Sequence, residues 1–178
     1  MRKSAWIGAH SSAKTTTVNR LAWFLKQEGK TVFMVREVPR DIPPDLSINQ
    51  DAGFAAQRWM VEEQIRRELK CERDALLWER GNDTIAYILC DRSIWDYLAY
   101  SLTLLNGGKM SSEEFEKIRE LVLFSLNILL PYDKIYFCEM KPLYDDGVRD
   151  LDEAWRDNVH NSFKKIIKDY QLDVVTVQ

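Results

Sequence analysis

The sequence has few cysteines, and no two of them are closely spaced. Cys71, Cys90 and Cys138 are the only three, and none forms a C-x-x-C motif. Structural zinc sites and disulfide scaffolds need clustered or paired cysteines, so this scarcity argues against both. We therefore expect no structural metal and a reducing, cytoplasmic setting, with Cys90 and Cys138 as small core residues within apolar runs.

Long apolar runs and an excess of one charge are also missing. The longest apolar run, residues 121–130, is interrupted by Ser125 and Asn127, and a membrane-spanning helix needs roughly 20 residues. The N-terminus lacks the apolar core of a secretory signal peptide. Lys and Arg total 25 and Asp and Glu 28, for a net charge of −3, which does not favour nucleic-acid binding. We expect neither a membrane nor a nucleic acid as partner.

The remaining composition is that of an ordinary globular domain. Apolar residues make up 46% and charged residues 30% of the 178 residues, a balance that argues against disorder. No internal repeat, low-complexity segment or linker divides the chain. Residues 1–178 are therefore predicted to form a single domain with a full core.

A phosphate-binding loop is the clearest motif that the sequence does contain. Residues 8–15 read Gly-Ala-His-Ser-Ser-Ala-Lys-Thr, which is the P-loop pattern G-x-x-x-x-G-K-[ST] with Ala13 in place of the second glycine. In such a loop, backbone N–H groups surround a phosphate, a lysine reaches the β- and γ-phosphates, and a hydroxyl binds Mg²⁺. Lys14 and Thr15 fit these two roles. The residues predicted to bind the nucleotide are Gly8, Ala9, His10, Ser11, Ser12, Ala13, Lys14, Thr15 and Thr16.

The flanking residues support this interpretation over that of an ordinary turn. Residues 5–7 form a short apolar run typical of a buried strand, and Val18, Leu21, Ala22 and Leu25 recur at the spacing of an amphipathic helix. A strand, a glycine-led loop and a helix that starts at the lysine are the arrangement that a P-loop requires.

Strands and helices are predicted to alternate along the chain. The other expected strands are residues 31–35, 85–90, 134–138 and 173–177, and the other expected helices are 52–80, 95–105, 111–130 and one after residue 150. This pattern predicts an α/β P-loop NTPase fold, a doubly wound, five-stranded, mostly parallel sheet with helices on both faces. Right-handed crossovers would bring the loops after the first four strands to one edge. We expect Lys14, Glu37, Asp91 and Arg149 to converge there.

The residues after the third strand favour phosphoryl transfer over hydrolysis. Asp91 stands where P-loop proteins place a second carboxylate linked to Mg²⁺. Many P-loop ATPases follow it with a glutamate that activates water, but here Arg92 follows, and a guanidinium cannot act as a base. It can clamp a phosphoryl group instead. The signals of a GTP switch, Asn-Lys-x-Asp and a glycine three positions after Asp91, are missing.

Two further groups of residues are candidates for binding the acceptor. Glu37 and Arg40 follow the second strand, at the carboxyl edge where open α/β sheets bind ligands. Gln57 and Gln64 lie seven residues apart on one helix and share a face. Their amides would read the edge of a planar ligand, or else belong to a solvated stripe.

Residues 141–156 resemble a lid. The stretch 141–150 is polar and rich in turn residues, and it includes Arg149, with Arg156 seven residues later. Kinases use lid arginines to neutralise the transition state and to exclude water. For each arginine the alternative is a surface salt bridge.

Four motifs together carry a family resemblance. Gly-x-x-x-x-Ala-Lys-Thr, Arg-Glu-x-Pro-Arg (36–40), Asp-Arg-Ser-x-x-Asp-x-x-Ala-Tyr (91–100) and Asp-Gly-x-Arg (146–149) occur in this order. The chain resembles the P-loop nucleoside/nucleotide kinase superfamily over nearly its whole length. The similarity is greatest to the AAA-like ATPase/kinase branch that contains the ribosylnicotinamide kinase domain, with thymidylate and deoxynucleoside kinases more distant.

The resemblance implies a function and a set of roles. The protein would transfer the γ-phosphate of ATP, with Mg²⁺, to a small-molecule acceptor, most plausibly a nucleoside or nucleotide. Asp91 would act on Mg²⁺ together with Thr15, Arg92 would contact the transferred or acceptor phosphate, and Glu37 would bind the acceptor hydroxyl as a candidate general base. Arg149 and Arg156 would be lid residues.

Two alternatives remain open at this stage. The chain would be a P-loop ATPase or ATP-sensing module without a small-molecule acceptor, or a P-loop module that binds partners without turnover. The sequence also leaves the oligomeric state open between a monomer and a homodimer.

Overall fold

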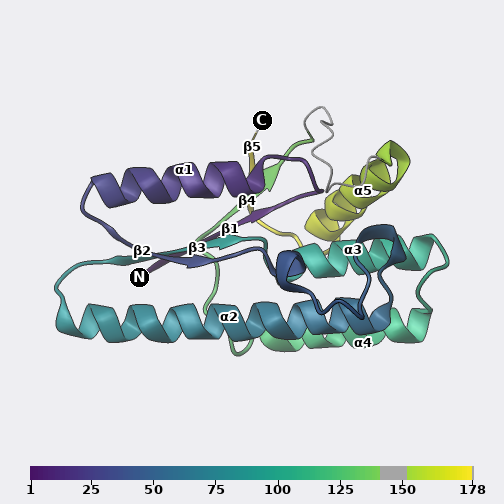
Figure 1. Ribbon diagram of the computed structural model, residues 1–178, viewed down its shortest axis with the longest axis horizontal. Helices are drawn as coiled ribbons and strands as arrows, with labels where there is room; N and C mark the ends of the chain where they lie inside the picture. The colour runs from purple at the N-terminus through teal and green to yellow at the C-terminus, as the bar shows by residue number, and fades with distance from the viewer. Residues whose placement is uncertain (141–151, 178) are drawn as a thin grey trace.

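Five parallel strands form one sheet in the order β2-β3-β1-β4-β5 (Figure 1). The computed structural model describes residues 1–140 and 152–177. The strands are β1 (Arg2–Ile7), β2 (Thr31–Val35), β3 (Ala86–Asp91), β4 (Lys134–Cys138) and β5 (Val174–Val177). All four strand pairs are parallel, so the predicted α/β sheet is confirmed and is wholly parallel within the described residues.

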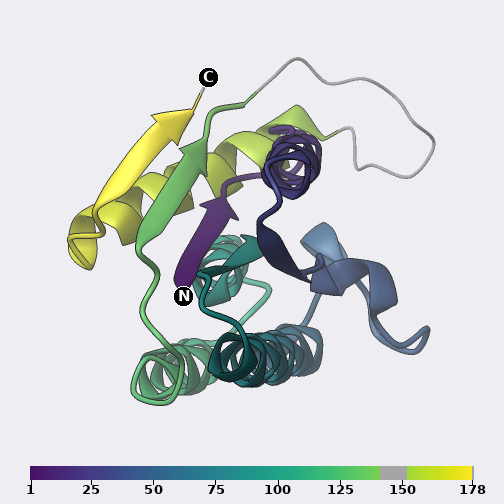
Figure 2. The same cartoon turned by 90° about the vertical axis from the view of Figure 1, so that its left-hand side faces the viewer.

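Helices cover both faces of this sheet. They are α1 (Lys14–Gln27), α2 (Phe54–Gly81), α3 (Ile94–Asn106), α4 (Ser112–Ser125) and α5 (Glu153–Asp169). On one face α1 buries Val18 and Ala22 against Trp6 and Leu89. The opposite face carries the main core, to which α2, α3, α4 and α5 all contribute. Figures 1 and 2 show α1 and α2 on opposite sides of the strands.

Strand register places three loops at one edge of the sheet. Trp6, near the end of β1, is aligned with Asp91 at the end of β3, and Val35 at the end of β2 is aligned with Cys90. Because parallel strands end at the same edge, the segments that follow β1, β2 and β3 begin side by side. After β2 the chain runs through two short 3₁₀ helices, η1 (Val38–Asp41) and η2 (Asn49–Asp51), before α2 begins.

Helix α3 is almost wholly buried and carries side chains to that edge. Each of residues 94–104 is buried. Ser93 caps the helix, because its hydroxyl accepts a hydrogen bond from the Trp95 N–H while Asp96 bonds back to the Ser93 N–H. The cap fixes where α3 starts, directly after the end of β3.

The helix predicted over residues 111–130 is shorter than expected, because α4 ends at Ser125. The hydroxyl of Ser125 donates to the carbonyl of Val122 at 2.6 Å and so competes with the helical pattern. The Leu130 N–H is bonded to Glu72 of α2 at 3.0 Å. The hydrogen bond to Glu72, which is distant in sequence, therefore favours a non-helical conformation at the end of the apolar run.

The expectations for the cysteines, the lid segment and membrane spans can be compared with the structure one by one. Cys90 and Cys138 are buried as predicted, and Cys71 is partly buried. Of the predicted lid, residues 141–151, including Arg149, lie outside the described residues. Residues 153–156 form the first turn of α5, and the lid stays a prediction. Among the described residues, no helix combines the length and apolar character that crossing a bilayer requires.

Candidate active site

The loop between β1 and α1 begins at a glycine that no other residue can replace without strain. Gly8 has a φ of 141°, and a Cβ built on it would lie 2.7 Å from the carbonyl oxygen of Cys138 in β4. Ser11 and Ala13 also have left-handed φ values, of 60° and 59°. The loop therefore turns twice in an unusual backbone conformation before α1 starts at Lys14.

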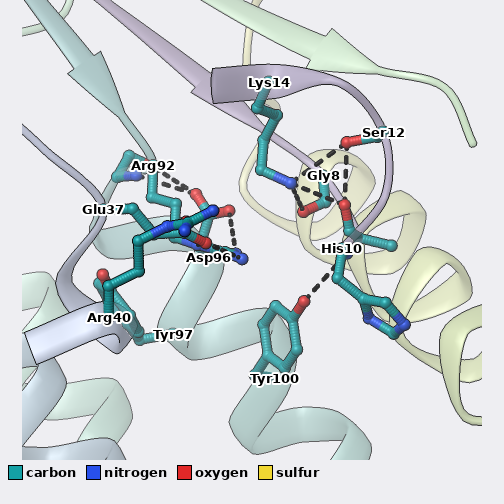
Figure 3. A network of polar contacts seen from close by, with 12 residues as sticks. Gly8, His10, Ser12, Lys14, Glu37, Arg40, Arg92, Asp96, Tyr97 and Tyr100 are labelled. Atoms are coloured by element: carbon teal, nitrogen blue, oxygen red, sulfur yellow. Dashed lines mark hydrogen bonds and ion pairs between the residues drawn. The ribbon is translucent and has the colours of Figure 1, made fainter. Parts of the chain in front are cut away.

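Lys14 points back into this loop. Its Nζ donates hydrogen bonds to the carbonyl oxygens of Gly8 (2.8 Å) and Ala9 (2.6 Å) and to the hydroxyl of Ser12 (3.1 Å) (Figure 3). The side chain is buried, and burial, with the nearby charge of Arg92, lowers the pKa of Lys14 to about 8. Carbonyls and a hydroxyl thus hold an ammonium group that no carboxylate of the described residues contacts directly.

Opposite the loop, Glu37 joins two arginines. One carboxylate oxygen, Oε1, accepts from Nε and Nη2 of Arg92 at 2.9 and 2.8 Å, and Oε2 accepts from Nε of Arg40 at 2.8 Å (Figure 3). Burial by itself would raise the pKa of Glu37, but the attraction of Arg92 and the bond from Arg40 outweigh it and lower the pKa to about 2. Glu37 is therefore a carboxylate at every physiological pH.

Arg92 is held from several directions in a strained conformation. Its φ is 91°, which a residue with a side chain rarely adopts. Its N–H bonds to the carbonyl of Trp6 at 3.2 Å, and Nη1 bonds to Asp96 at 3.3 Å. Asp96 is fully buried, and burial raises the pKa of its carboxyl to about 6 despite the nearby guanidinium. Strain of this kind persists only where the surroundings over-determine the conformation.

Gln64 is one of the residues that hold Arg92 in this conformation, and it does not line the cavity. Its Nε2 donates to the carbonyl of Arg92 at 3.2 Å and to Glu68 at 2.7 Å, and its Oε1 accepts from the hydroxyl of Tyr97 at 3.1 Å. Its amide is thus used within the protein. Of the two glutamines predicted to read a planar ligand, the structure brings only Gln57 to the cavity.

Asp91 and Thr15 meet at the carboxyl end of β3. Asp91 is 4% exposed, and its Oδ1 has no hydrogen-bond partner among the described residues. Burial raises the pKa of Asp91, against a hydrogen bond with Thr15 that lowers it. A buried carboxylate oxygen beside a hydroxyl is a donor set that suits Mg²⁺, which often takes one or two protein oxygens and completes its shell with water and phosphate. The described residues contain no cluster of three or more His, Cys, Asp or Glu able to hold a metal by themselves.

One cavity of about 490 Å³ joins the loop to the Glu37–Arg92 pair. This volume lies within the range of sites that enclose small ligands. The predicted site residues that line it are His10, Ser11, Ser12, Ala13, Lys14, Thr15, Thr16, Glu37, Arg40, Gln57 and Arg92. Gly8, Ala9 and Asp91 lie next to these residues but do not line the cavity. Arg156, predicted to lie in a lid, is buried in the first turn of α5 and does not line the cavity either.

The structure adds residues that the sequence analysis did not single out. Tyr97, Tyr100 and Met60 line the cavity. The Tyr100 hydroxyl accepts from the His10 N–H at 3.1 Å, and its ring lies 5.5 Å from the Arg92 guanidinium. A local signal for Asp96 did exist, since it stands three residues after Ser93 and four after Arg92, at cap and ion-pair spacing. Tyr97 had no such signal, and Tyr100 stood out only as the last residue of the motif at 91–100.

Comparison with known sequences agrees with the geometry. A family profile described as an AAA domain matches residues 3–178. Two thymidylate kinases of Bifidobacterium longum, from strain DJO10A and from subspecies infantis, are each 28% identical to this chain. The alignments cover 96% of this chain and 82% and 72%, respectively, of those proteins.

Solved structures share the fold at lower identity. NadR protein in complex with NAD and AMP-PNP superposes with a TM-score of 0.67 at 18% identity, over 99% of this chain and 44% of that one. This chain thus spans less than half of NadR. A deoxyadenosine kinase from M. mycoides gives 0.63 at 14% identity, and a thymidylate kinase from Ehrlichia chaffeensis 0.66 at 16%, covering 90% and 86% of those chains. The resemblance to P-loop nucleoside and nucleotide kinases and the P-loop fold are confirmed.

Proposed function

This chain belongs to the AAA-domain family, and from that premise we propose that it is an ATP- and Mg²⁺-dependent kinase that phosphorylates a nucleoside or nucleotide. The observation that carries the proposal is the single cavity with Lys14 and its loop on one wall and Glu37 with Arg92 on the other. Both ends of a phosphoryl transfer need such groups. The donor needs backbone N–H groups and a cation, and the acceptor needs an orienting group close to the transferred phosphoryl.

On the donor side, the loop from Gly8 to Thr16 holds the phosphates of ATP. Binding exchanges the bonds from Lys14 to the Gly8 and Ala9 carbonyls for bonds to phosphate oxygens. The low pKa of Lys14 reflects burial and the nearby charge of Arg92, which outweigh the attraction of the surrounding carboxylates, and an anionic ligand would favour the charged ammonium. Mg²⁺ would neutralise phosphate charge when bound, and Thr15 with Asp91 would hold it.

On the acceptor side, Glu37 orients the acceptor and Arg92 stabilises charge on the moving phosphoryl group. A carboxylate with a pKa near 2 is a weak base, so Glu37 acts mainly as a hydrogen-bond acceptor that aligns a hydroxyl. This suffices in a loose transition state, in which little proton transfer is needed before the new bond forms. Arg40, 67% exposed and paired with Glu37, borders the same wall.

Gln57 is proposed to recognise the acceptor's planar ring. It is 1% exposed, and its Oε1 has no hydrogen-bond partner among the described residues. A buried amide oxygen left unpaired is costly, unless a ligand donates to it. Met60 and Tyr97 supply apolar surface beside it. Arg149, outside the described residues, remains a predicted lid arginine, and the reducing, cytoplasmic setting and a homodimeric state remain predictions.

The test is acceptor-dependent release of ADP. The protein is incubated with Mg-ATP and a panel of nucleosides and nucleotides, and ADP is measured by a coupled assay. We expect at least one acceptor to stimulate release well above the rate with ATP alone. Acceptor-independent release would instead support the ATPase alternative, and undetectable binding of Mg-ATP would support a module without turnover.

A matched pair of variants tests the donor site independently. Lys14→Ala should abolish measurable ATP binding in calorimetry, because the lost group is a charge at the phosphate and not a packing element. Lys26→Ala, an exposed lysine on the same helix, should bind ATP as the parent does. Equal affinity in both variants would remove the P-loop from the mechanism.

A further inference from the structure

The acceptor wall of the cavity is electrically balanced. The charged residues that line the cavity, within the part of the chain that the structure describes, are Lys14, Glu37, Arg40 and Arg92. Lys14 belongs to the donor loop. The two arginines are paired with Glu37, and Asp96 lies directly behind Arg92. Two guanidinium groups thus face two carboxylates, and no net positive charge is left for an incoming anion.

The free hydrogen-bonding position on Glu37 itself is specific in kind. A carboxylate offers about four lone pairs. On Glu37, Oε1 uses two of them for Arg92 and Oε2 uses one for Arg40. The remaining position, on Oε2, accepts a hydrogen bond and can therefore take only a donor, such as a hydroxyl group.

A phosphate monoester is the wrong partner for that position. It carries between one and two negative charges at neutral pH and offers mainly acceptor oxygens. Next to Glu37 it would meet a carboxylate that stays ionised, and like charges at contact repel strongly in a buried site. To bind it, Arg92 would have to release Glu37 and leave that carboxylate buried without its partner.

We propose that the acceptor is a neutral hydroxyl, as on the sugar of an unphosphorylated nucleoside, and not the phosphate of a nucleoside monophosphate. This inference rests on the proposed kinase function and narrows its substrate class. Glu37 accepts a hydrogen bond from the hydroxyl at Oε2, and three of the five N–H groups of Arg92 hold Glu37 and Asp96. The guanidinium also interacts with the Tyr100 side chain, and its remaining N–H capacity serves the transferred phosphoryl group.

The transfer step then balances as follows. The hydroxyl oxygen attacks the γ-phosphorus of ATP and forms a new P–O bond. The bond from that phosphorus to the bridging oxygen breaks, and the electron pair leaves on the β-phosphate of ADP. The hydroxyl proton stays hydrogen-bonded to Glu37 while the new bond forms, and it leaves to solvent late in the step, because a carboxyl with so low a pKa does not retain it.

The experiment compares each nucleoside with its own 5′-monophosphate as acceptor, using the full chain and Mg-ATP. We expect at least one nucleoside to stimulate ADP release, with kcat/KM at least about tenfold higher than for its monophosphate, the factor that 1.4 kcal/mol of discrimination gives. If a monophosphate is the better acceptor, the inference is overturned while the kinase function stands. If neither member of any pair stimulates release, both are overturned.

A variant separates charge balance from simple shape. Glu37→Gln removes the carboxylate and frees Arg92, so the ratio of kcat/KM for monophosphate over nucleoside should rise at least about tenfold, as the like-charge repulsion disappears. Glu62→Gln makes the same change on the exposed side of α2, where Glu62 pairs with Arg58, and should leave the ratio unchanged. An unchanged ratio in Glu37→Gln would overturn the charge argument.

Discussion

Two buried clusters of charge sit on either side of Gln64, and they differ in what surrounds them. At the start of β1, Lys3 contacts Glu68 at 2.7 Å and Glu72 at 2.6 Å, all three almost wholly buried. The Lys3 Nζ also donates to the carbonyl of Leu130, and the Tyr132 hydroxyl bonds to Glu68. At the end of β3, Arg92 pairs with Glu37 and Asp96 beside the cavity.

Backbone strain separates the two clusters as well. Among the described residues, five non-glycine residues have left-handed φ values: Ser11, Ala13, Asn49, Arg92 and Gln171. The first four line the cavity, and none of the five belongs to the Lys3 cluster. The Lys3 cluster therefore has closed hydrogen bonding and relaxed backbone, whereas the Arg92 cluster has strained backbone and an open lone pair. Strain and incomplete bonding together mark a site for a ligand.

The largest effect is expected from Arg92→Ala, which removes the centre of the cavity cluster. Acceptor-dependent turnover should fall by about 10²–10³-fold, as for the loss of one preorganised donor at a transition state. ATP affinity should change much less than turnover, because among the described residues Arg92 makes no hydrogen bond to the loop of residues 8–16 and acts on Lys14 only through its charge. Steady-state kinetics and calorimetry check the two parts.

Arg92→Lys is the control for this change. It keeps the charge but not the planar fork that bonds Glu37 twice and Asp96 once, so turnover should stay well below that of the parent. Full turnover in Arg92→Ala would mean that the Arg92 cluster, like the Lys3 cluster, only stabilises the fold and takes no part in the reaction.

The next effect is expected from Lys3→Met, which breaks the other cluster. It leaves Glu68 and Glu72 buried without their cation, which should lower the free energy of unfolding by about 3–5 kcal/mol. Urea unfolding measures this loss. Lys30→Met, at an exposed lysine, is the control and should change the stability little.

The turnover of the folded fraction of Lys3→Met should equal that of the parent, because this cluster does not touch the cavity. A large loss of kcat with no loss of stability would show that the Lys3 cluster acts on the reaction through Gln64.

The third effect concerns Lys14 and pH. Its pKa of about 8 in the free protein means that the ammonium is fully charged only about one pH unit or more below that value and loses its proton as the pH rises through 8. Since phosphate binding favours the charged form, ATP affinity should be constant well below the pKa, begin to fall as the pH approaches 8, and fall above it by up to about tenfold per pH unit. The profile is measured by calorimetry of ATP binding over about three pH units, centred on that pKa.

Lys14→Arg provides the control for the pH profile, because a guanidinium stays charged throughout this range. Whatever its absolute affinity, the variant should show no fall above pH 8. A flat profile in the parent would mean that Lys14 keeps an ordinary lysine pKa.

The contrast between the clusters also explains what could be predicted from the sequence. The P-loop, Glu37 and Arg92 follow strands directly, so periodicity and crossover handedness were sufficient to bring them to one edge. Lys3 gave no such signal. The apolar run pointed only to residues 5–7, yet β1 starts at Arg2 and includes Lys3, whose charge is neutralised by Glu68 and Glu72, about 70 residues away in sequence.

Gln64 was misassigned for the same reason. Helical spacing correctly placed Gln57 and Gln64 on one face of α2, but the partners of that face are side chains from β1, β3 and α3. Two turns of the helix decide whether an amide meets a cavity or the carbonyl of Arg92. Helical spacing in the sequence determines which residues share a face of α2, but only the tertiary structure determines which groups pack against each of them.

The smallest effect is expected from Ala13→Gly, which relaxes strain on the cavity wall. Ala13 has φ 59° and ψ 21° at the N-cap of α1, a conformation that costs a residue with a Cβ roughly 1–2 kcal/mol. Glycine avoids this cost but adds about 0.4–1 kcal/mol of unfolded-state entropy, so the variant should gain stability by about 0.5 kcal/mol. Ala55→Gly, at an exposed site in the first turn of α2, has no strain to relieve and should lose stability by about 0.5–1 kcal/mol. Thermal unfolding of the two variants should therefore shift in opposite directions, and a shift in the same direction would show that the loop stores no strain at Ala13.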